Sequence, residues 1–231
     1  MDVLSFTTAM SIAVEQGIRV LPFWLPDGPA TASERAAAEK AAAVCARQSG
    51  ARLAVARNAV TPDSPWSLSP AHLRRAPFVA RLVLPSPNGA AIAAAAPAGV
   101  RVVAACLHNI TAVGNWLTTR GWGTPEHPVA VIAPGEQRGD GSLRPAPEDL
   151  LGSCALICDL YALGPGPLSA ECAAAKAAYE GTADLTRAIA ACTSGRQLAA
   201  VGFAEDLAIA TAEDISAVVP VRDPGQASAA G

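Results

Sequence analysis

The stretch VAVIAPGEQRGDGSLRPAPEDLLGS, residues 129–153, predicts a strand, a long loop and a helix in succession. Its apolar beginning, residues 129–133, is typical of a buried strand. The loop that follows is far longer than the about two to six residues common between strand and helix, and such long connections are often functional. Pro147 suits the first helical position, which places Glu148 and Asp149 in the first turn, beside free backbone N–H groups. The stretch therefore indicates both an α/β fold and a candidate site.

The composition sets the class of protein. With 231 residues, 51% of them hydrophobic and 16% charged, the chain can bury a full core. Its net charge of −3 offers no electrostatic footprint for nucleic acid or an anionic membrane, so neither is expected as a partner. The six cysteines include no CxxC pair and the three histidines are scattered, which argues against a zinc site. Because the sequence shows no signal peptide and no apolar run long enough to span a bilayer, we expect a cytoplasmic protein. A homo-oligomer is possible.

Predicted strands and helices alternate along most of the chain. This favours an α/β fold with three α/β/α layers and a largely parallel or mixed sheet. With no linker or repeat, we expect one domain over residues 1–221 and a disordered tail over residues 222–231. Residues 2–4 read as the end of a truncated first strand. The other predicted strands are residues 18–24, 52–56, 80–84, 100–106, 129–133 and 217–221; the predicted helices are 9–16, 31–48, a brief one from Ser69, 90–96, 110–119, 148–161, 169–180, 183–192, 195–201 and a short one flanked by 206–207 and 214–215.

Four short polar clusters each follow a predicted strand. Because the carboxyl ends of parallel strands meet at one edge, we expect the clusters to gather there. Helix N-termini rich in Ser, Thr and Asn bind anions, and clustered carboxylates bind Mg²⁺, which prefers oxygen ligands. An anion cradle beside Mg²⁺ is the equipment of phosphoryl chemistry. The clusters are Asp2 with Ser5, Thr7 and Thr8; Ser86 with Asn88 and Gly89; His108 with Asn109; and Glu148 with Asp149.

Each cluster taken alone also has a plainer explanation. Hydroxyl and amide side chains cap ordinary helices, Asn-Gly forms plain turns, and an acidic pair in a first turn complements the helix dipole. Arg138 and Arg144 in the long loop are simply solvated unless they fold inward onto an anion. Asp2 is harder to dismiss, because strands disfavour Asp. The chain has no GxxxxGK[ST], GxGxxG or GxSxG motif, so the P-loop, Rossmann and hydrolase-elbow readings lack their signatures.

At these clusters the sequence resembles the 2-phosphosulfolactate phosphatase family, Mg²⁺-dependent enzymes first associated with coenzyme M biosynthesis. The resemblance extends from Asp2 to Pro220, and its order and spacing are more specific than any one motif. The residues that carry it are Asp2-Val3-Leu4 with Thr7-Thr8, Ser69-Pro70, the run 84–89, Asn109 with Ala112-Val113, Glu148-Asp149-Leu150, Gly195-Arg196, Leu198, Gly202-Phe203, Asp206 and Val219-Pro220.

The resemblance implies a hydrolase that converts 2-phospho-3-sulfolactate to sulfolactate and phosphate. As a hypothesis, the catalytic residues hold Mg²⁺ or its activated water, and hydroxyl, amide and guanidinium groups hold the small anionic substrate. The catalytic and metal-binding residues would be Asp2, Glu148 and Asp149, and the substrate-binding residues Thr7, Thr8, Ser86, Asn88, Gly89, Asn109, Arg138 and Arg144.

The chain departs from the family pattern at several positions. Ser5, Ala56 and Ala91 stand where the family has Arg, Glu and Arg, and those losses favour two alternatives: a phosphatase of a different phospho-acid, or a non-catalytic homologue that binds an anionic metabolite. Family members also carry a strand before Asp2, whereas only Met1 precedes it here. We therefore expect either a start upstream or the loss of that strand.

Overall fold

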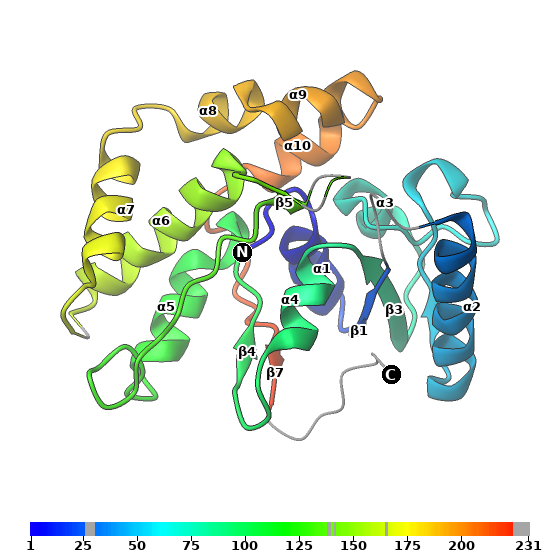
Figure 1. Cartoon of the computed structure of the whole chain (residues 1–231), viewed down its shortest axis with the longest axis horizontal. Helices are drawn as coiled ribbons and strands as arrows, with labels where there is room; N and C mark the ends of the chain where they lie inside the picture. Colours follow the sequence, from blue (N-terminus) through cyan, green and yellow to red (C-terminus); the bar gives the residue numbers. More distant parts are fainter. Residues whose placement is uncertain (26–30, 138–139, 141, 165, 224–231) are drawn as a thin grey trace.

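The computed structural model describes residues 1–25, 31–137, 140, 142–164 and 166–223. Helices and strands alternate through the first half of the chain, and helices dominate the second half (Figure 1). The α-helices are α1 (Phe6–Glu15), α2 (Ala32–Ser49), α3 (Pro70–Arg75), α4 (Gly89–Ala95), α5 (Ile110–Thr118), α6 (Pro147–Ala162), α7 (Ala170–Glu180), α8 (Leu185–Ala191), α9 (Thr193–Ala200) and α10 (Ala204–Ala210). The strands are β1 (Arg19–Trp24), β2 (Arg52–Leu53), β3 (Arg81–Ser86), β4 (Val102–Val103), β5 (Glu136–Gln137), β6 (Leu143–Arg144) and β7 (Val221–Arg222), and the 3₁₀ helices are η1 (Arg57–Ala59) and η2 (Leu107–Asn109).

A three-stranded parallel sheet forms the centre of the N-terminal half, in the order β1-β3-β2. Trp24 at the end of β1 lies opposite Ser86 at the end of β3. On the other side of β3, Ala54 just beyond β2 donates its N–H to the carbonyl of Val83. The carboxyl ends of these strands point upward in Figure 1, where α1, α3 and α4 begin. The predicted parallel sheet is confirmed.

Helices cover both faces of this sheet. Since side chains alternate between the two faces of a strand, Val83 packs with Phe23 against α2, whereas Leu82 and Leu84 pack against α1 and α3. The predicted α/β/α layering is therefore present around β3. Helix α2 begins at Thr31 with the capping box that the sequence indicates.

A second core lies among the C-terminal helices and the start of the chain. Val3 packs there with apolar side chains of α5, α6 and α8. Figure 1 shows α5, α6 and α7 on one side of α1, the sheet with α2 and α3 on the other, and α8 to α10 across the top. The N-terminal residues thus lie where the two halves meet.

Several strand predictions are wrong in whole or in part; of residues 217–221, for example, only Val221 lies in a strand, β7. Residues 129–133 form no strand: Val129 and Val131 pack against the helical core while Ile132 is half exposed, so the apolar run covers helices and not a sheet. Residues 2–4 form no strand either, because they lead directly into α1. Within residues 100–106 only β4 is a strand, and it pairs antiparallel with β7, outside the central sheet.

The C-terminal boundary also differs from the prediction. Arg222 belongs to β7, so the ordered chain continues past residue 221. Residues 224–231 of the predicted tail lie outside the described residues. Among the helices of the described part of the chain, none combines the length and apolarity needed to cross a membrane.

Candidate active site

Asp2 connects the starts of two helices. Its Oδ1 accepts the N–H of Phe6, the first residue of α1, at 3.2 Å, and its Oδ2 accepts the N–H of Gly89, the first residue of α4, at 3.1 Å. The side chain is largely buried. A Cβ on Gly89 would lie 2.2 Å from the Phe6 ring and 2.9 Å from Oδ2 of Asp2, so only glycine permits this approach. The Asn-Gly pair therefore serves close packing at the carboxylate, which a simple turn would not require.

Asp149 lies in the first turn of α6, where Pro147 is the first helical residue as predicted. Its Oδ1 accepts the N–H of Val3 at 2.8 Å and its Oδ2 accepts the N–H of Gly135 at 3.2 Å. Because Val3 is the neighbour of Asp2, the first bond brings the two carboxylates together. The predicted association of the N-terminal cluster with the start of α6 is thus realised through the main chain.

Burial makes these carboxylates hard to ionise. The pKa of Asp149 is raised to about 8, first by burial and then by the negative charge of Asp2. Burial also raises the pKa of Asp2, and the N–H groups of Phe6 and Gly89 offset part of that effect. The site therefore holds acidic groups whose negative charge no neighbouring cation fully compensates.

Glu148, beside Asp149, is also buried, with an exposed fraction of 2%. Its Oε2 lies 3.1 Å from Sγ of Cys192, which also caps α9 by accepting the N–H of Gly195. Burial raises the pKa of the Cys192 thiol to about 11, so the sulfur keeps its proton and donates it to Glu148. This contact orients one oxygen of Glu148 and leaves the other unengaged by the thiol.

The long loop folds into the β5–β6 hairpin beside these acids. Arg144 on β6 lies 3.6 Å from a carboxylate oxygen of Glu136 on β5, and its Nη2 donates to Oγ of Ser194 at 2.9 Å. Burial raises the pKa of Glu136, while the charge of Arg144 and the side chain of Asn88 lower it. Arg144 therefore ties the hairpin to α9. Arg138, predicted to bind the substrate from the same loop, lies outside the described residues.

Ser86 is a polar group that no neighbour satisfies. It ends β3 with an exposed fraction of 2%, and its Oγ has no hydrogen-bond partner among the described residues. A buried hydroxyl without a partner is costly, so such a group suggests that a ligand supplies the missing contact. Asn88, two residues on, makes no side-chain cap to α4. Both residues shortly precede Gly89 in the chain, and the N–H of Gly89 binds Asp2.

Three other predicted site residues have hydrogen bonds inside the fold. Thr7 and Thr8 donate their hydroxyl groups to the carbonyls of Asp2 and Val3, at 2.7 and 2.8 Å. Asn109 is fully buried, accepts the N–H of Cys106 and donates to the carbonyl of Val218. These side chains hold the N-terminal turn and the C-terminal segment in place. They do so without capping α1 or α5, since neither helix begins with a side-chain cap hydrogen bond.

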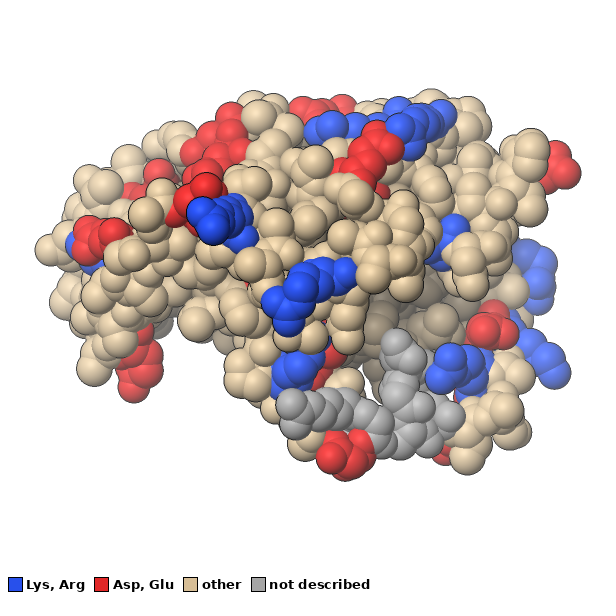
Figure 2. Space-filling view, turned by 90° about the horizontal axis from the view of Figure 1, so that it is seen from above, with Lys and Arg blue, Asp and Glu red and all other residues tan. Residues whose placement is uncertain are grey.

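Arg57 is a site residue that the sequence reasoning did not single out. Its Nη2 donates to Oγ of Ser5 at 2.7 Å, three residues from Asp2 along the chain, and its Nε lies 3.4 Å from Asp206. Position 57 follows β2, at the same sheet edge as Ser86, and that placement was the available signal. Figure 2, seen from above, shows basic and acidic side chains interspersed on the surface.

A model of the 2-phosphosulpholactate phosphatase family matches residues 1–225. The chain belongs to this family. The resemblance found in the sequence is thereby confirmed over nearly the whole chain, and with it the class of phosphoric monoester hydrolases acting on a small phosphorylated molecule. No curated protein matches the chain. The grouping of Asp2, Ser86, Gly89 and Asp149 is thus the candidate active site of a 2-phosphosulpholactate phosphatase family member.

Proposed function

We propose that this family member hydrolyses 2-phospho-3-sulfolactate to sulfolactate and inorganic phosphate in a Mg²⁺-dependent reaction. The observation that carries the proposal is the pair of buried carboxylates, Asp2 and Asp149, held together by backbone N–H groups. Two acids at the sheet edge repel a polyanionic substrate unless a cation lies between them and the phosphate. Phosphate-ester hydrolysis depends on such neutralisation of charge.

The side chains at the site fit Mg²⁺. An ionised carboxylate can accept about four hydrogen bonds or ligand contacts, and Asp2 and Asp149 each use two for backbone N–H groups. Among the described residues no salt bridge neutralises these acids, since Arg57 pairs with Asp206 and Arg144 with Glu136. The same residues contain no group of three or more His, Cys, Asp or Glu placed to hold a metal ion. Mg²⁺ commonly binds through one or two carboxylates with water and substrate phosphate, which matches this arrangement.

The proposal gives each side chain a task. Mg²⁺ at this site would neutralise charge on the transferred phosphoryl group and help to activate the attacking water. Asp2 and Asp149 would hold the ion, and the unpaired hydroxyl of Ser86 would donate to a phosphate oxygen. Glu148, with one oxygen engaged by Cys192, accepts the proton that the attacking water releases. The water oxygen forms a bond to phosphorus as the ester P–O bond breaks, and Glu148 passes the proton it accepted to the alkoxide, which leaves as sulfolactate.

The test is phosphate release from 2-phospho-3-sulfolactate, measured with Mg²⁺ and with a chelator in excess. We expect release that the chelator abolishes and added Mg²⁺ restores. Equal rates of phosphate release with Mg²⁺ and with chelator would show that the reaction does not require the metal. Phosphate release from 2-phospholactate but not from 2-phospho-3-sulfolactate would show that the substrate is a different phospho-acid. Binding of sulfolactate without hydrolysis of any phospho-acid would identify a non-catalytic homologue.

A further inference from the structure

Arg57 places a positive charge at the same sheet edge as the proposed phosphate site. It begins η1, four residues after the end of β2. The register of β2 and β3 aligns Leu53 with Val83, so the chain leaving β2 runs beside the end of β3, where Ser86 lies. The exposed fraction of the Arg57 side chain is 24%, so the side chain is only partly buried.

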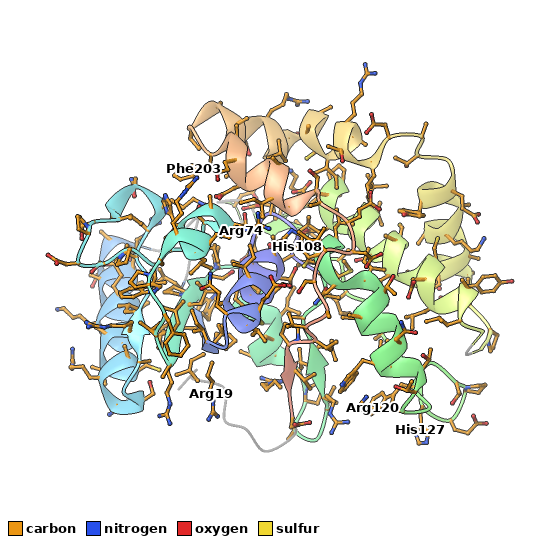
Figure 3. All side chains as sticks on the ribbon, turned by 180° about the vertical axis from the view of Figure 1, so that it is seen from behind. Arg19, Arg74, His108, Arg120, His127 and Phe203 are labelled. Carbon is orange, nitrogen blue, oxygen red and sulfur yellow. The ribbon has the colours of Figure 1, made fainter. Side chains whose placement is uncertain are left out.

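The surrounding residues fix the guanidinium in place. Asp206, whose side chain is fully buried, lies 3.4 Å from Nε of Arg57 and uses its other oxygen for the hydroxyl of Ser69, at 2.6 Å, and the N–H of Ala71, at 2.9 Å. The ring of Phe203 lies under the guanidinium, 5.7 Å from its Cζ. Figure 3 shows Phe203 where the C-terminal helices meet α3. An arginine held in this way loses little entropy when it binds a ligand.

The ion pair with Asp206 leaves donors of Arg57 unused. A dedicated structural pair between Arg and a carboxylate is often bidentate and shorter than 3 Å or so. Here the contact is a single one at 3.4 Å, because Asp206 also serves Ser69 and Ala71. Among the described residues, Nη1 makes no hydrogen bond, so a second group can occupy that edge.

Ser5 extends the same donor surface toward Asp2. Its Oγ accepts from Nη2 of Arg57, and among the described residues it donates to no acceptor. Ser5 is buried and immediately precedes Phe6, whose N–H holds Asp2. Arg57 and Ser5 therefore present a guanidinium edge and a hydroxyl proton next to the proposed catalytic acids.

We propose that Arg57 and Ser5 form a second oxyanion subsite, which binds the acidic group of the substrate that is not hydrolysed. The ligand chemistry is a planar carboxylate or a sulfonate carried one carbon from the phosphorylated carbon. The inference rests on the proposed function, because it assumes that the phosphate lies at Ser86 and Asp2. It explains how a site built around carboxylates can favour a substrate that carries additional negative charge.

The test compares Arg57→Met with wild type on three phosphate esters: 2-phospho-3-sulfolactate, 2-phospholactate and glycerol 2-phosphate, which lacks both acids. We expect kcat/KM to fall about 10–100-fold, mainly through KM, on esters that carry the bound acid, as for loss of one charged hydrogen bond. Glycerol 2-phosphate should be hydrolysed at the wild-type rate. Loss on the sulfonate ester alone assigns the subsite to sulfonate, and loss on both acids assigns it to carboxylate.

Arg75→Met is the matched control, because Arg75 pairs with Glu205, the neighbour of Asp206, but is exposed at the surface. It should leave all three rates unchanged. Arg57→Lys keeps the charge beside Asp206 but loses the forked donors, so it should show the same substrate pattern with a smaller loss. The Arg57→Lys variant also provides the test if Arg57→Met does not fold.

Two results would overturn the subsite. One is an equal loss of activity on all three esters in both Arg57 variants, which would mean that Arg57 acts only through the fold or the phosphate. The other is wild-type activity of both Arg57 variants on all three esters, which would mean that the substrate does not bind Arg57. Failure of wild type to hydrolyse any of the esters refutes the proposed function by itself and leaves the subsite to a binding measurement. Calorimetry of sulfolactate and lactate binding then decides: equal affinity of wild type and the Arg57 variants, or no binding at all, rejects the subsite.

Discussion

The backbone N–H of Val3 donates a 2.8 Å hydrogen bond to Oδ1 of Asp149, joining residues 146 positions apart in the chain. Because Val3 follows Asp2 directly, this bond brings together two acids that are far apart in the sequence. Gly152, one turn further along α6, lets the helix approach Val3, since a Cβ there would lie 2.8 Å from its side chain. Packing and hydrogen bonding therefore act together to build the acidic pair.

Replacing Glu148 by Gln tests the proposed proton acceptor. The amide keeps the size and polarity of the side chain but cannot take up a proton, so we expect turnover to fall about 10²-fold or more, as when one preorganised catalytic group is lost. The measurement is the steady-state rate of phosphate release in saturating Mg²⁺.

Glu171→Gln supplies the control for this change. Glu171 is the second residue of α7, as Glu148 is of α6, but it is exposed. Its replacement should leave the rate unchanged. Wild-type turnover in Glu148→Gln would exclude Glu148 as the proton acceptor.

Stability without metal should depend on the ionisation of Asp149. Its pKa rises from an ordinary 3.8 to about 8 on folding, so between these values the folded state binds a proton that the unfolded state does not. The free energy of unfolding in chelator should therefore fall as the pH rises through this window and level off above about pH 8.

Urea unfolding between pH 5 and pH 9 measures this effect, with Asp149→Asn to subtract the other titrating groups. The variant should lack the decline that wild type shows. Added Mg²⁺ should raise the wild-type midpoint more at pH 8 than at pH 6, because only the ionised pair attracts the ion. A decline of equal size in both proteins would mean that Asp149 is not the titrating group.

Gly89→Ala tests the close approach at Asp2. The added methyl group collides with the ring of Phe6, so it should cost about 1–3 kcal/mol of unfolding free energy, as overpacking does. It should also lower activity, because the N–H of Gly89 holds Oδ2 of Asp2.

Gly181→Ala provides the comparison, since its Cβ would meet nothing nearer than the carbonyl of Ala177 at 3.3 Å. Gly181 caps α7, away from the acids. We expect a small change in melting temperature and full activity. If Gly89→Ala behaved in the same way, the carboxylate of Asp2 would not need this contact.

Thr31→Ala addresses the fold alone. The hydroxyl of Thr31 accepts the N–H of Glu34, and the carboxylate of Glu34 accepts the N–H of Thr31. Loss of this capping box should cost about 1 kcal/mol of unfolding free energy. Chemical denaturation gives the value, and kcat should stay at its wild-type level because α2 contributes none of the proposed catalytic groups.

The sequence predicted those parts of the fold that local chemistry decides. The capping box at Thr31, Pro147 as the first residue of α6 and the helical spacing of the C-terminal half all act over a few residues. The strand predicted over residues 80–84 is likewise present as β3, Arg81–Ser86. The predicted bounds of these elements lie close to those seen in the structure.

The strand prediction for residues 129–133 failed because an apolar run shows burial and not a pairing partner. Its side chains pack against helices, and Ile132 stays half exposed. The strand prediction for residues 100–106 failed for a related reason. Only pairing with β7, near the end of the described chain, decides which of these residues form a strand. Sheet membership depends on non-local hydrogen bonds that no single stretch contains.

The sequence by itself determined the family, the α/β class and the residue types that gather at the candidate site, because these follow from order, spacing and local propensity. The tertiary structure alone decided which of those residues meet. It joined Asp2 to Asp149 through Val3, kept Thr8 and Asn109 inside the fold, and brought Arg57 to Ser5. Each of these contacts joins residues that are not neighbours in the sequence. Its energy therefore depends on the tertiary structure and not on the local sequence.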